Sequence, residues 1–378
     1  MGFGGFIFSE DTSDLSNGEY QLACRTLDAI SRIMVERTRL AITHPDQAKI
    51  FMPDEGWHPE SQPSFELDGS TQNAQTSYEL LAEKDRDIIR KMRLYSHAFT
   101  GYQLATLEFA AQRPWVSDKL PEDWDNSLRR LAGPPDQSVF EYVKVASALP
   151  RHLRITPPMK FGEIGWLWDG KIVNYDTASY LERICLLEEN GILRLLASRQ
   201  NESGIVNIVE IGGGYGGLAY FLSVILGKSI RYTIIDIPES LAFSATYLSI
   251  LFPQADHKIY SNNSNIPKNF SPGYGFLPNM FCSSWSAGTP PVDLVINTLS
   301  LSEMSDRQIE EYCKDISNMI GTSGIFFEQN HQLDHRGPGG IPPSHFKLLR
   351  KCHSDILTDT YPQKRGQANL WVNQEYKE

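Results

Sequence analysis

A glycine-rich segment at residues 209–221 has the residue types and the spacing of a ligand-binding turn. It follows an apolar, β-favouring run, passes through Glu210, Gly212, Gly214 and Gly216, and leads directly into an amphipathic helical pattern. This order predicts a strand, a tight turn and a helix N-terminus, where backbone N–H groups can approach a nucleotide-like ligand. Glycine at these positions removes the Cβ atoms that would block such an approach or forbid a positive φ.

Two ligand classes fit the spacing of this turn. Gly212-x-Gly214-x-x-Gly217 matches the dinucleotide fingerprint, with Asp236 about 20 residues further on as an acid for the ribose. The acid-led pattern of Glu210 and the glycines matches the loop that binds S-adenosylmethionine (SAM). A carboxylate at Glu210 would repel a pyrophosphate and attract the cationic amino-acid end of SAM. The acid therefore favours SAM, and the alternative for Glu210 is a strand-end acid that caps a nearby amide.

Alternating strand and helix patterns from about residue 160 onward predict the framework that positions this turn. Strand patterns occur at 205–211, 230–236, 257–260, 293–297 and 324–328. Helical patterns lie between or before them at 180–196, 218–226, 240–251 and 306–320. This order implies a largely parallel sheet with helices on both faces, and such sheets bind ligands at the carboxyl ends of their strands. The glycine turn, Asp236 and the loop after Asn297 are therefore expected to meet at one edge.

The C-terminal segment predicts a different ending to the sheet. Residues 344–352 have a helical pattern, whereas 356–361 and 368–373 have the pattern of two strands separated by a short turn. Two strands joined so tightly must be antiparallel, because a parallel crossover needs a dozen or more residues. A parallel sheet that ends in an antiparallel hairpin is typical of SAM-dependent methyltransferases and unusual in nicotinamide-binding domains.

Residues 1–159 have a different texture, which predicts a mainly helical region. Helical patterns cover 15–42, 78–113 and 140–149, and a stretch rich in Pro, Ser, Gly and Gln separates the first two. The predicted domain boundary therefore lies between this region and an α/β unit at 160–378. We expect the helical region to form a substrate lid or the surface of a homodimer, or else a structural cap.

Charge and composition restrict the possible partners. The formal net charge of −11 argues against broad binding to nucleic acid, which requires a basic face. No apolar run approaches the roughly 18 residues that span a bilayer, so no membrane partner is expected. The five cysteines are scattered without a C-x-x-C pair, and no secretory leader is evident, so we expect a cytoplasmic protein with reduced thiols.

Four segments resemble the sugar O-methyltransferase family, namely EIGGGYGG, YTIIDIPESL, VDLVINTLSLSEMS and GIFFEQN. The preceding stretch FGEIGWLWDGKIVNYDTASYLERICLLEENGIL is similar to that family as well. The resemblance implies a Rossmann-like class I methyltransferase fold, SAM as the cofactor and a sugar-like small molecule as the methyl acceptor. Glu210 would then meet the amino-acid end of SAM, and the glycine loop would pass beside its methionine and ribose. Asp236 would accept hydrogen bonds from the ribose hydroxyls, with an N-cap as its alternative role, and Ile237 would pack on the adenine.

The loop after the fourth predicted strand provides the first candidate for a catalytic residue. Class I methyltransferases place substrate and catalytic groups at this exit, and the plant small-molecule O-methyltransferases have His-Asp there, where this chain has Ser302-Glu303. Glu303 is the first candidate for the general base, and an acid at a helix N-terminus is the alternative. His331, just after the fifth strand, is the second candidate, and an ordinary loop histidine is the alternative.

Further residues are assigned to cofactor or substrate on the same grounds. Asn297, at the end of the fourth strand, is expected to contact the cofactor, and Ser302 the substrate. Tyr180 and Arg183 are three residues apart on one predicted helix face and could close over SAM.

No metal is expected, because the candidate ligands His331, Asp334 and His335 precede a Gly-Pro-Gly-Gly segment that makes this stretch a loop. Three other functions stay open. They are methyl transfer to another oxygen or nitrogen acceptor, a non-catalytic module that binds SAM or a protein partner, and, least favoured, a nicotinamide oxidoreductase.

Overall fold

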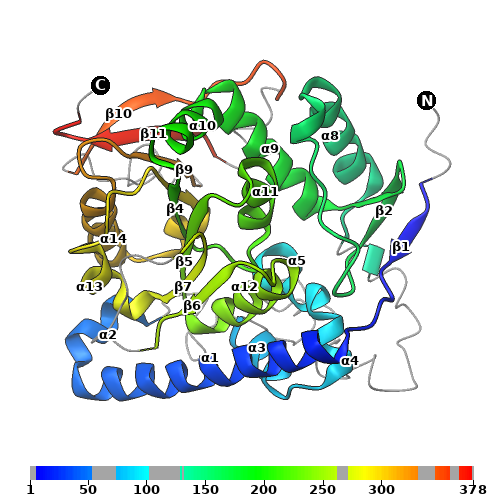
Figure 1. Cartoon of the computed structure of the whole chain (residues 1–378), viewed down its shortest axis with the longest axis horizontal. Coiled ribbons are helices and arrows are strands. Elements are labelled where there is room, and N and C mark those ends of the chain that lie inside the picture. The colour runs from blue at the N-terminus through cyan, green and yellow to red at the C-terminus, as the bar shows by residue number, and fades with distance from the viewer. Residues whose placement is uncertain are drawn as a thin grey trace.

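An eight-stranded sheet runs through the middle of the computed structural model, which describes residues 6–52, 74–101, 128–129, 132–261, 271–330, 345–357 and 366–376 (Figure 1). The strands are β4 Val206–Ile211, β5 Ile230–Asp236, β6 Asp256–Ile259, β7 Gly273–Pro278, β8 Leu294–Thr298, β9 Ile325–Gln329, β10 Phe346–Lys351 and β11 Ala368–Asn373. Their order in the sheet is β10-β11-β9-β8-β4-β5-β7-β6. The strands from β4 to β9 pair in parallel, whereas β11 is antiparallel to both β9 and β10. The predicted α/β architecture, a largely parallel Rossmann-like sheet that ends in an antiparallel C-terminal strand pair and follows a mainly helical N-terminal region, is confirmed.

The sheet contains one parallel strand, β7, that the sequence patterns did not indicate. It lies between β5 and β6 and pairs with both. Its sequence, Gly-Tyr-Gly-Phe-Leu-Pro, contains the residues that usually mark turns. All six of its residues are buried, so packing outweighs the weak local preference for a strand.

The hairpin is built from other residues than the sequence predicted. The helix predicted at 344–352 is wrong, because residues 346–351 form the edge strand β10. The strand predicted at 356–361 is wrong in its described part, since Ile356 and Leu357 lie in a bend; residues 358–361 lie outside the described residues. Leu, Lys and Arg favour helices, but pairing with β11 and burial of the Phe346 ring against Phe326 outweigh that preference.

Helices cover both faces of the sheet (Figure 1). Because alternate residues of a strand point to opposite faces, Ile208 and Ile234 belong to one apolar core and Val209 and Ile235 to the other. The first core is covered by α9 Tyr175–Glu189, α10 Ile192–Ser203, α11 Gly217–Leu226 and α12 Pro238–Leu251. The second is covered by α13 Cys282–Ser286 and α14 Asp306–Ile320.

The sequence predicts one helix at 180–196, but the structure has two helices there, α9 and α10. Asn190 ends α9, and Gly191, with a φ of +78°, precedes α10. A left-handed conformation at this position interrupts the helical hydrogen-bond ladder, and glycine adopts it without steric strain.

The N-terminal region is mainly helical, and the long helix predicted at 15–42 is confirmed as α1 Asn17–Thr43. The further helices are α2 Pro45–Phe51, α3 Ala74–Ala82, α4 Arg86–Arg90, α5 Met92–Gly101 and α8 Pro135–Ala148. Helix α1 packs along α12, next to the sheet (Figure 1). A small antiparallel sheet pairs β1 Phe8–Glu10, near the start of this region, with β2 Ile164–Trp168 and β3 Lys171–Val173, which follow its end. Within the described ranges, no helix combines the length and apolarity that a bilayer-spanning segment requires.

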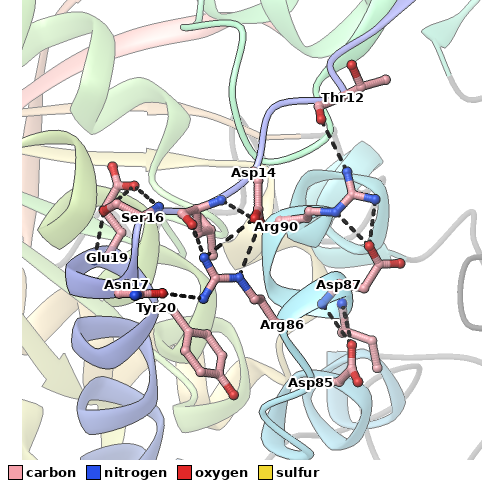
Figure 2. Close-up of polar contacts among 12 residues, drawn as sticks. Thr12, Asp14, Ser16, Asn17, Glu19, Tyr20, Asp85, Arg86, Asp87 and Arg90 are labelled. Atoms are coloured by element: carbon pink, nitrogen blue, oxygen red, sulfur yellow. Dashed lines mark hydrogen bonds and ion pairs between the residues drawn. The ribbon is translucent and has the colours of Figure 1, made fainter.

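Local polar contacts explain where α1 begins and how α4 is attached to it (Figure 2). Ser16 and Glu19 form a capping box, in which the Ser16 N–H donates to Glu19 across 2.8 Å. The Arg86 guanidinium donates to Asp14 and Asn17 across 3.3 and 3.1 Å. These contacts are exposed and therefore contribute little stability, but they fix the orientation of α4 against the start of α1.

Candidate active site

A pocket opens at the carboxyl ends of β4, β5 and β8, the edge at which the sequence predicted a ligand. The turn after β4 contributes Gly212 and Gly214 to its wall, and the end of β5 contributes Asp236 and Ile237. The parallel pairing of β4 with β5 and β8 brings these turns to one edge. The pocket continues over the loop after β8, through Thr298, Leu299, Ser300, Glu303 and Met304.

The shape of the turn requires glycine at Gly212 and Gly214. Gly212 has a φ of +75° and lies so close to Ser300 that a Cβ would overlap its side chain. Gly214 has a φ of +54°, and its N–H donates to Asp236 Oδ2 across 3.0 Å. Gly216 is the N-cap residue of α11 and lies against Leu248, away from the residues that line the pocket. The turn thus keeps open a surface that larger residues would fill.

Asp236 is the central polar group of the pocket. Its two oxygens accept the N–H groups of Gly214 and Ile237, across 3.0 and 2.8 Å. Burial by the surrounding protein raises its pKa to about 7, although both hydrogen bonds lower it. The alternative role as an N-cap is wrong, because Ile237 occupies the N-cap position of α12 and Pro238 follows it. A carboxylate has about four acceptor sites, so Asp236 can accept further hydrogen bonds from a ligand.

Glu210 lies on the opposite face of the sheet from the pocket. It alternates with Ile211, which lines the pocket, so its side chain points toward the core beneath α9 and α11. The carboxylate is buried and accepts a hydrogen bond from the Tyr232 hydroxyl across 2.8 Å. Burial raises its pKa to about 7, while the hydrogen bond from Tyr232 and the charge of Arg183 lower it. Its contact with the amino-acid end of SAM stays a prediction.

Tyr180 and Arg183 lie on the Glu210 side of the sheet, and neither lines the pocket. The Tyr180 ring packs against Phe221 and Tyr215, and the Arg183 guanidinium lies 5.5 Å from the Tyr180 ring centroid. Both side chains are buried in the core. Their predicted closure over a ligand is therefore not supported by the pocket, and it stays a prediction.

Asn297 and Ser302 hold the loop after β8 by hydrogen bonds outside the pocket lining. The Asn297 amide donates to the Ile211 carbonyl across 2.9 Å and to Ser300 Oγ across 2.5 Å. Ser302 donates its hydroxyl to the Leu299 carbonyl. Neither residue lines the pocket, so their cofactor and substrate contacts stay predictions. Leu299, which does line it, has a φ of +71°, a strained conformation that the surrounding bonds hold in place.

Glu303 is the catalytic candidate that the described residues bring to the pocket. It ends the short 3-10 helix η6 (Ser300–Glu303) and is exposed at the pocket wall. Helix α14 begins only after its N-cap, Ser305, so Glu303 precedes the helix and is not one of its first-turn acids. His331 lies outside the described residues, as do Asp334 and His335. Among the described side chains, no group of three or more His, Cys, Asp or Glu is placed to bind a metal.

The N-terminal region contributes to the pocket through one residue that no sequence pattern singled out, and its expected role as a substrate lid stays a prediction. Met52, just after α2, lines the pocket together with Asn279, Gln308 and Tyr312. The Gln308 amide donates to the carbonyls of Ile50 and Met52 across 3.1 and 3.0 Å. Asn279 donates to the carbonyl of Phe51 across 2.7 Å. Two amide side chains of the sheet domain thus attach the end of α2 to the pocket.

No family model and no curated protein matches this chain. Solved structures with a similar arrangement include the mitomycin 7-O-methyltransferase, at 14% identity and a TM-score of 0.29, over 53% of this chain and 58% of that one. The magnesium protoporphyrin IX methyltransferase of Synechocystis PCC 6803 with bound SAM has 11% identity and a TM-score of 0.29, over 68% and 97%. A mutant of MtNAS in complex with SAM has 14% identity and a TM-score of 0.35, over 92% and 97%. The chain thus spans less than two thirds of the first of these proteins, and its fold class rests on its own strand order.

Proposed function

We propose that this chain is a SAM-dependent O-methyltransferase that acts on a hydroxyl of a sugar or of a glycosylated or other polar small molecule. The observation that carries the proposal is the charge of the pocket. The described residues that line it include two carboxylic acids, Asp236 and Glu303, and no Lys, Arg or His. SAM contains a sulfonium and an ammonium group, whereas a dinucleotide contains an anionic pyrophosphate. An acidic pocket therefore favours SAM.

The glycine turn supports the same choice. In a dinucleotide site, N–H groups of this turn and of the helix N-terminus face the pyrophosphate. Here the Gly214 N–H already donates to Asp236, so a carboxylate occupies one of those donors. The Glu210 carboxyl lies behind the turn, 3.1 Å from the position that a Cβ of Gly213 would take. Two acids around one turn, each with a pKa of about 7 and therefore partly ionised at neutral pH, disfavour a pyrophosphate and are compatible with a cationic ligand.

The pocket residues suggest how the cofactor would lie. Asp236 would accept the ribose hydroxyls, because a carboxylate can accept from two adjacent donors. Ile237 and Met52 would supply apolar contacts to the adenine, and the methyl group would point toward the loop that carries Glu303. Burial of the adenine between such side chains would contribute about 25 cal/mol for each Å² of apolar surface.

In the proposed reaction the bound cofactor supplies an activated methyl group. Asp236 and the glycine turn would hold SAM, whose sulfonium would give up its methyl carbon in line to the acceptor oxygen and leave as the neutral sulfur of S-adenosylhomocysteine. The hydroxyl proton passes to Glu303 or to water. The chain's part is to hold the oxygen close to the methyl carbon and to accept the proton, which are the roles of positioning and general-base catalysis.

The polar character of the β8 loop supports a hydroxylated acceptor. Thr298, Ser300 and Glu303 line this part of the pocket with hydroxyl and carboxyl groups. Such groups can pair with sugar hydroxyls, while Leu299 and Met304 of the same loop add apolar contacts. The sequence resemblance to sugar O-methyltransferases points to the same acceptor class.

Calorimetry and a transfer assay test the proposal together. S-adenosylhomocysteine is expected to bind, while NAD and NADP give no heat. Methyl-labelled SAM is then incubated with the protein and a panel of free sugars, nucleotide sugars and glycosides. Binding of NAD without binding of S-adenosylhomocysteine would refute the cofactor. Cofactor binding without label in any acceptor, oxygen or nitrogen, would favour a non-catalytic SAM-binding module.

A further inference from the structure

We propose that Arg93, in the N-terminal helix α5, is a positioning residue that holds the glycine turn in its ligand-binding shape. The inference rests on the proposed cofactor site, because it concerns the turn of that site. The guanidinium carbon of Arg93 lies 3.6 Å from the centroid of the Tyr215 ring. Tyr215 stands between Gly214 and Gly216, inside the turn itself. A residue about 120 positions earlier in the chain therefore contacts the turn from behind.

The Arg93 guanidinium is fixed in place by ion pairs. It donates from Nε to one oxygen of Glu163 across 2.7 Å, and from a terminal nitrogen to the other across 3.2 Å. The same nitrogen donates to Asp176 across 3.1 Å, and the second terminal nitrogen donates to Ser96 across 3.0 Å. The side chains of Arg93 and Glu163 are fully buried. The planar fork of arginine makes these bonds together, which a lysine cannot do.

The two carboxylates that hold Arg93 come from two other parts of the chain. Glu163 precedes β2 and accepts the Asn174 amide across 2.6 Å. Asp176 lies in the first turn of α9. Burial alone would raise the pKa of Asp176, but the hydrogen bond with His97 and the charge of Arg93 outweigh it and hold the pKa at about 2. The guanidinium is thus clamped between α5, the lead into β2, and α9.

Tyr215 is held from the other sides by aromatic rings. Tyr180 and Tyr247 meet it edge to face, with centroids 5.9 and 5.3 Å away. The Tyr215 side chain is buried, and glycines with positive φ flank it on both sides. Glycine-rich backbone has high conformational freedom, so the turn needs anchors to keep one shape. One anchor is the hydrogen bond from Gly214 to Asp236 on the pocket side. The other is the contact of the Tyr215 ring with the Arg93 guanidinium.

This arrangement gives the N-terminal region a role that pocket contacts alone do not show. Arg93 does not line the pocket, yet it fixes the residue next to Gly214, which does. If the turn is loosened, the cofactor has to order it on binding. The entropic cost of this ordering lowers the affinity for the cofactor. Cofactor affinity therefore depends on the docking of α5 against the sheet domain.

The test uses the full-length protein and four variants. Tyr215→Leu removes the ring, Tyr215→Phe keeps it, and Arg93→Lys keeps the charge but not the fork. Tyr142→Leu is the matched control, because Tyr142 is a buried tyrosine of α8 that contacts Trp168 and not the turn. Two quantities are measured: hydrogen exchange of peptides covering residues 210–221 in the unliganded protein, and the Kd for S-adenosylhomocysteine.

Tyr215→Leu and Arg93→Lys are expected to speed exchange in the turn and to weaken S-adenosylhomocysteine binding by roughly 10- to 30-fold, the effect expected for a desolvated cation–π contact. Tyr215→Phe should behave as wild type. Tyr142→Leu should lower the thermal midpoint without either effect.

If Tyr215→Leu matches Tyr142→Leu in both measurements, Arg93 is only structural and the inference is wrong. Should Arg93→Lys fail to fold, Tyr215→Leu still decides, since it leaves the ion pairs intact. If the wild type does not bind S-adenosylhomocysteine, the proposed function fails, and the exchange of the turn decides the inference alone.

Discussion

The backbone N–H of Gly214 donates to Asp236 Oδ2 across 3.0 Å, so the turn after β4 is joined to the end of β5 at the pocket. This bond has two consequences. It holds the glycine turn open toward the ligand, and it uses one acceptor site of the acid that we assign to the ribose. Asp236 therefore supports the shape of the turn as well as its chemistry.

Replacement of Asp236 by Asn is expected to weaken S-adenosylhomocysteine binding by roughly 5- to 150-fold, corresponding to about 1–3 kcal/mol for a buried group that loses its partner. Asn keeps one acceptor oxygen but replaces the other with a donor, which cannot accept a ribose hydroxyl or the Gly214 N–H. Calorimetry measures the effect. Asp169→Asn, at an exposed position between β2 and β3, is the control and should leave the Kd unchanged. Equal Kd values for wild type and Asp236→Asn would mean that neither a ribose contact nor the bond to Gly214 contributes to cofactor affinity.

Glu210 predicts how stability depends on pH. Its pKa is raised to about 7 in the folded protein, mainly by burial, and is about 4.3 in an unfolded chain. Between these values the folded state holds a proton that the unfolded state has released, so this group's contribution makes stability fall as pH rises from about 4 to 7. Asp236, with its pKa also raised to about 7, acts in the same direction.

The variant Glu210→Gln removes this titration while its amide oxygen still accepts from Tyr232. The thermal midpoint of the variant should therefore exceed that of the wild type at pH 8, and its decline between pH 4 and 7 should be shallower. Glu202→Gln, on the exposed side of α10, serves as the control. Identical slopes for Glu210→Gln and wild type would mean that Glu210 is ionised across the whole range.

Met52 offers a direct test of the pocket wall that the N-terminal region supplies. Met52→Trp places a larger side chain where the pocket is lined, and overpacking of about 1–3 kcal/mol would weaken S-adenosylhomocysteine binding by roughly 5- to 150-fold. Val35→Trp, at a 70% exposed position of α1, is the matched control. Calorimetry at a temperature well below both thermal midpoints separates binding from folding. Unchanged affinity in Met52→Trp would place the cofactor away from α2.

The sequence predicted the parts of the site that depend on local order. A strand, a glycine turn and an acid at the next strand end must meet once the strands pair in parallel, and they do. The orientation of Glu210 was also accessible, because strand alternation puts it on the opposite face from Ile211. The motif predicts that Glu210 meets the ligand, and this contact stays a prediction.

Other features depend on tertiary contacts that no local pattern encodes. Met52 reaches the pocket because amides of Asn279 and Gln308, far along the chain, bind the backbone at the end of α2. Gln308 forms a capping box with Ser305 at the start of α14, and this local role does not indicate that Gln308 also lines the pocket. Strand β10 carries a helix-favouring sequence and is a strand only because β11 pairs with it.

Glu303 separates an enzyme from a binding module. It is the described carboxylate on the β8 loop that lines the pocket, and Gln has the same shape without the basic oxygen. If Glu303 accepts the acceptor proton, Glu303→Gln should lower kcat by roughly 10²–10⁴-fold, the usual effect of a positioned general base. The Kd for S-adenosylhomocysteine should change little, because this product lacks the sulfonium charge that the Glu303 carboxylate would attract in SAM. Asp306→Asn replaces an exposed acid at the start of α14 and controls for a change of charge near the loop.

His331→Ala is measured beside Glu303→Gln with the same acceptor and saturating SAM. A large loss in His331→Ala alone would move the base to the loop after β9, and full activity in both variants would mean that positioning of the hydroxyl suffices for transfer.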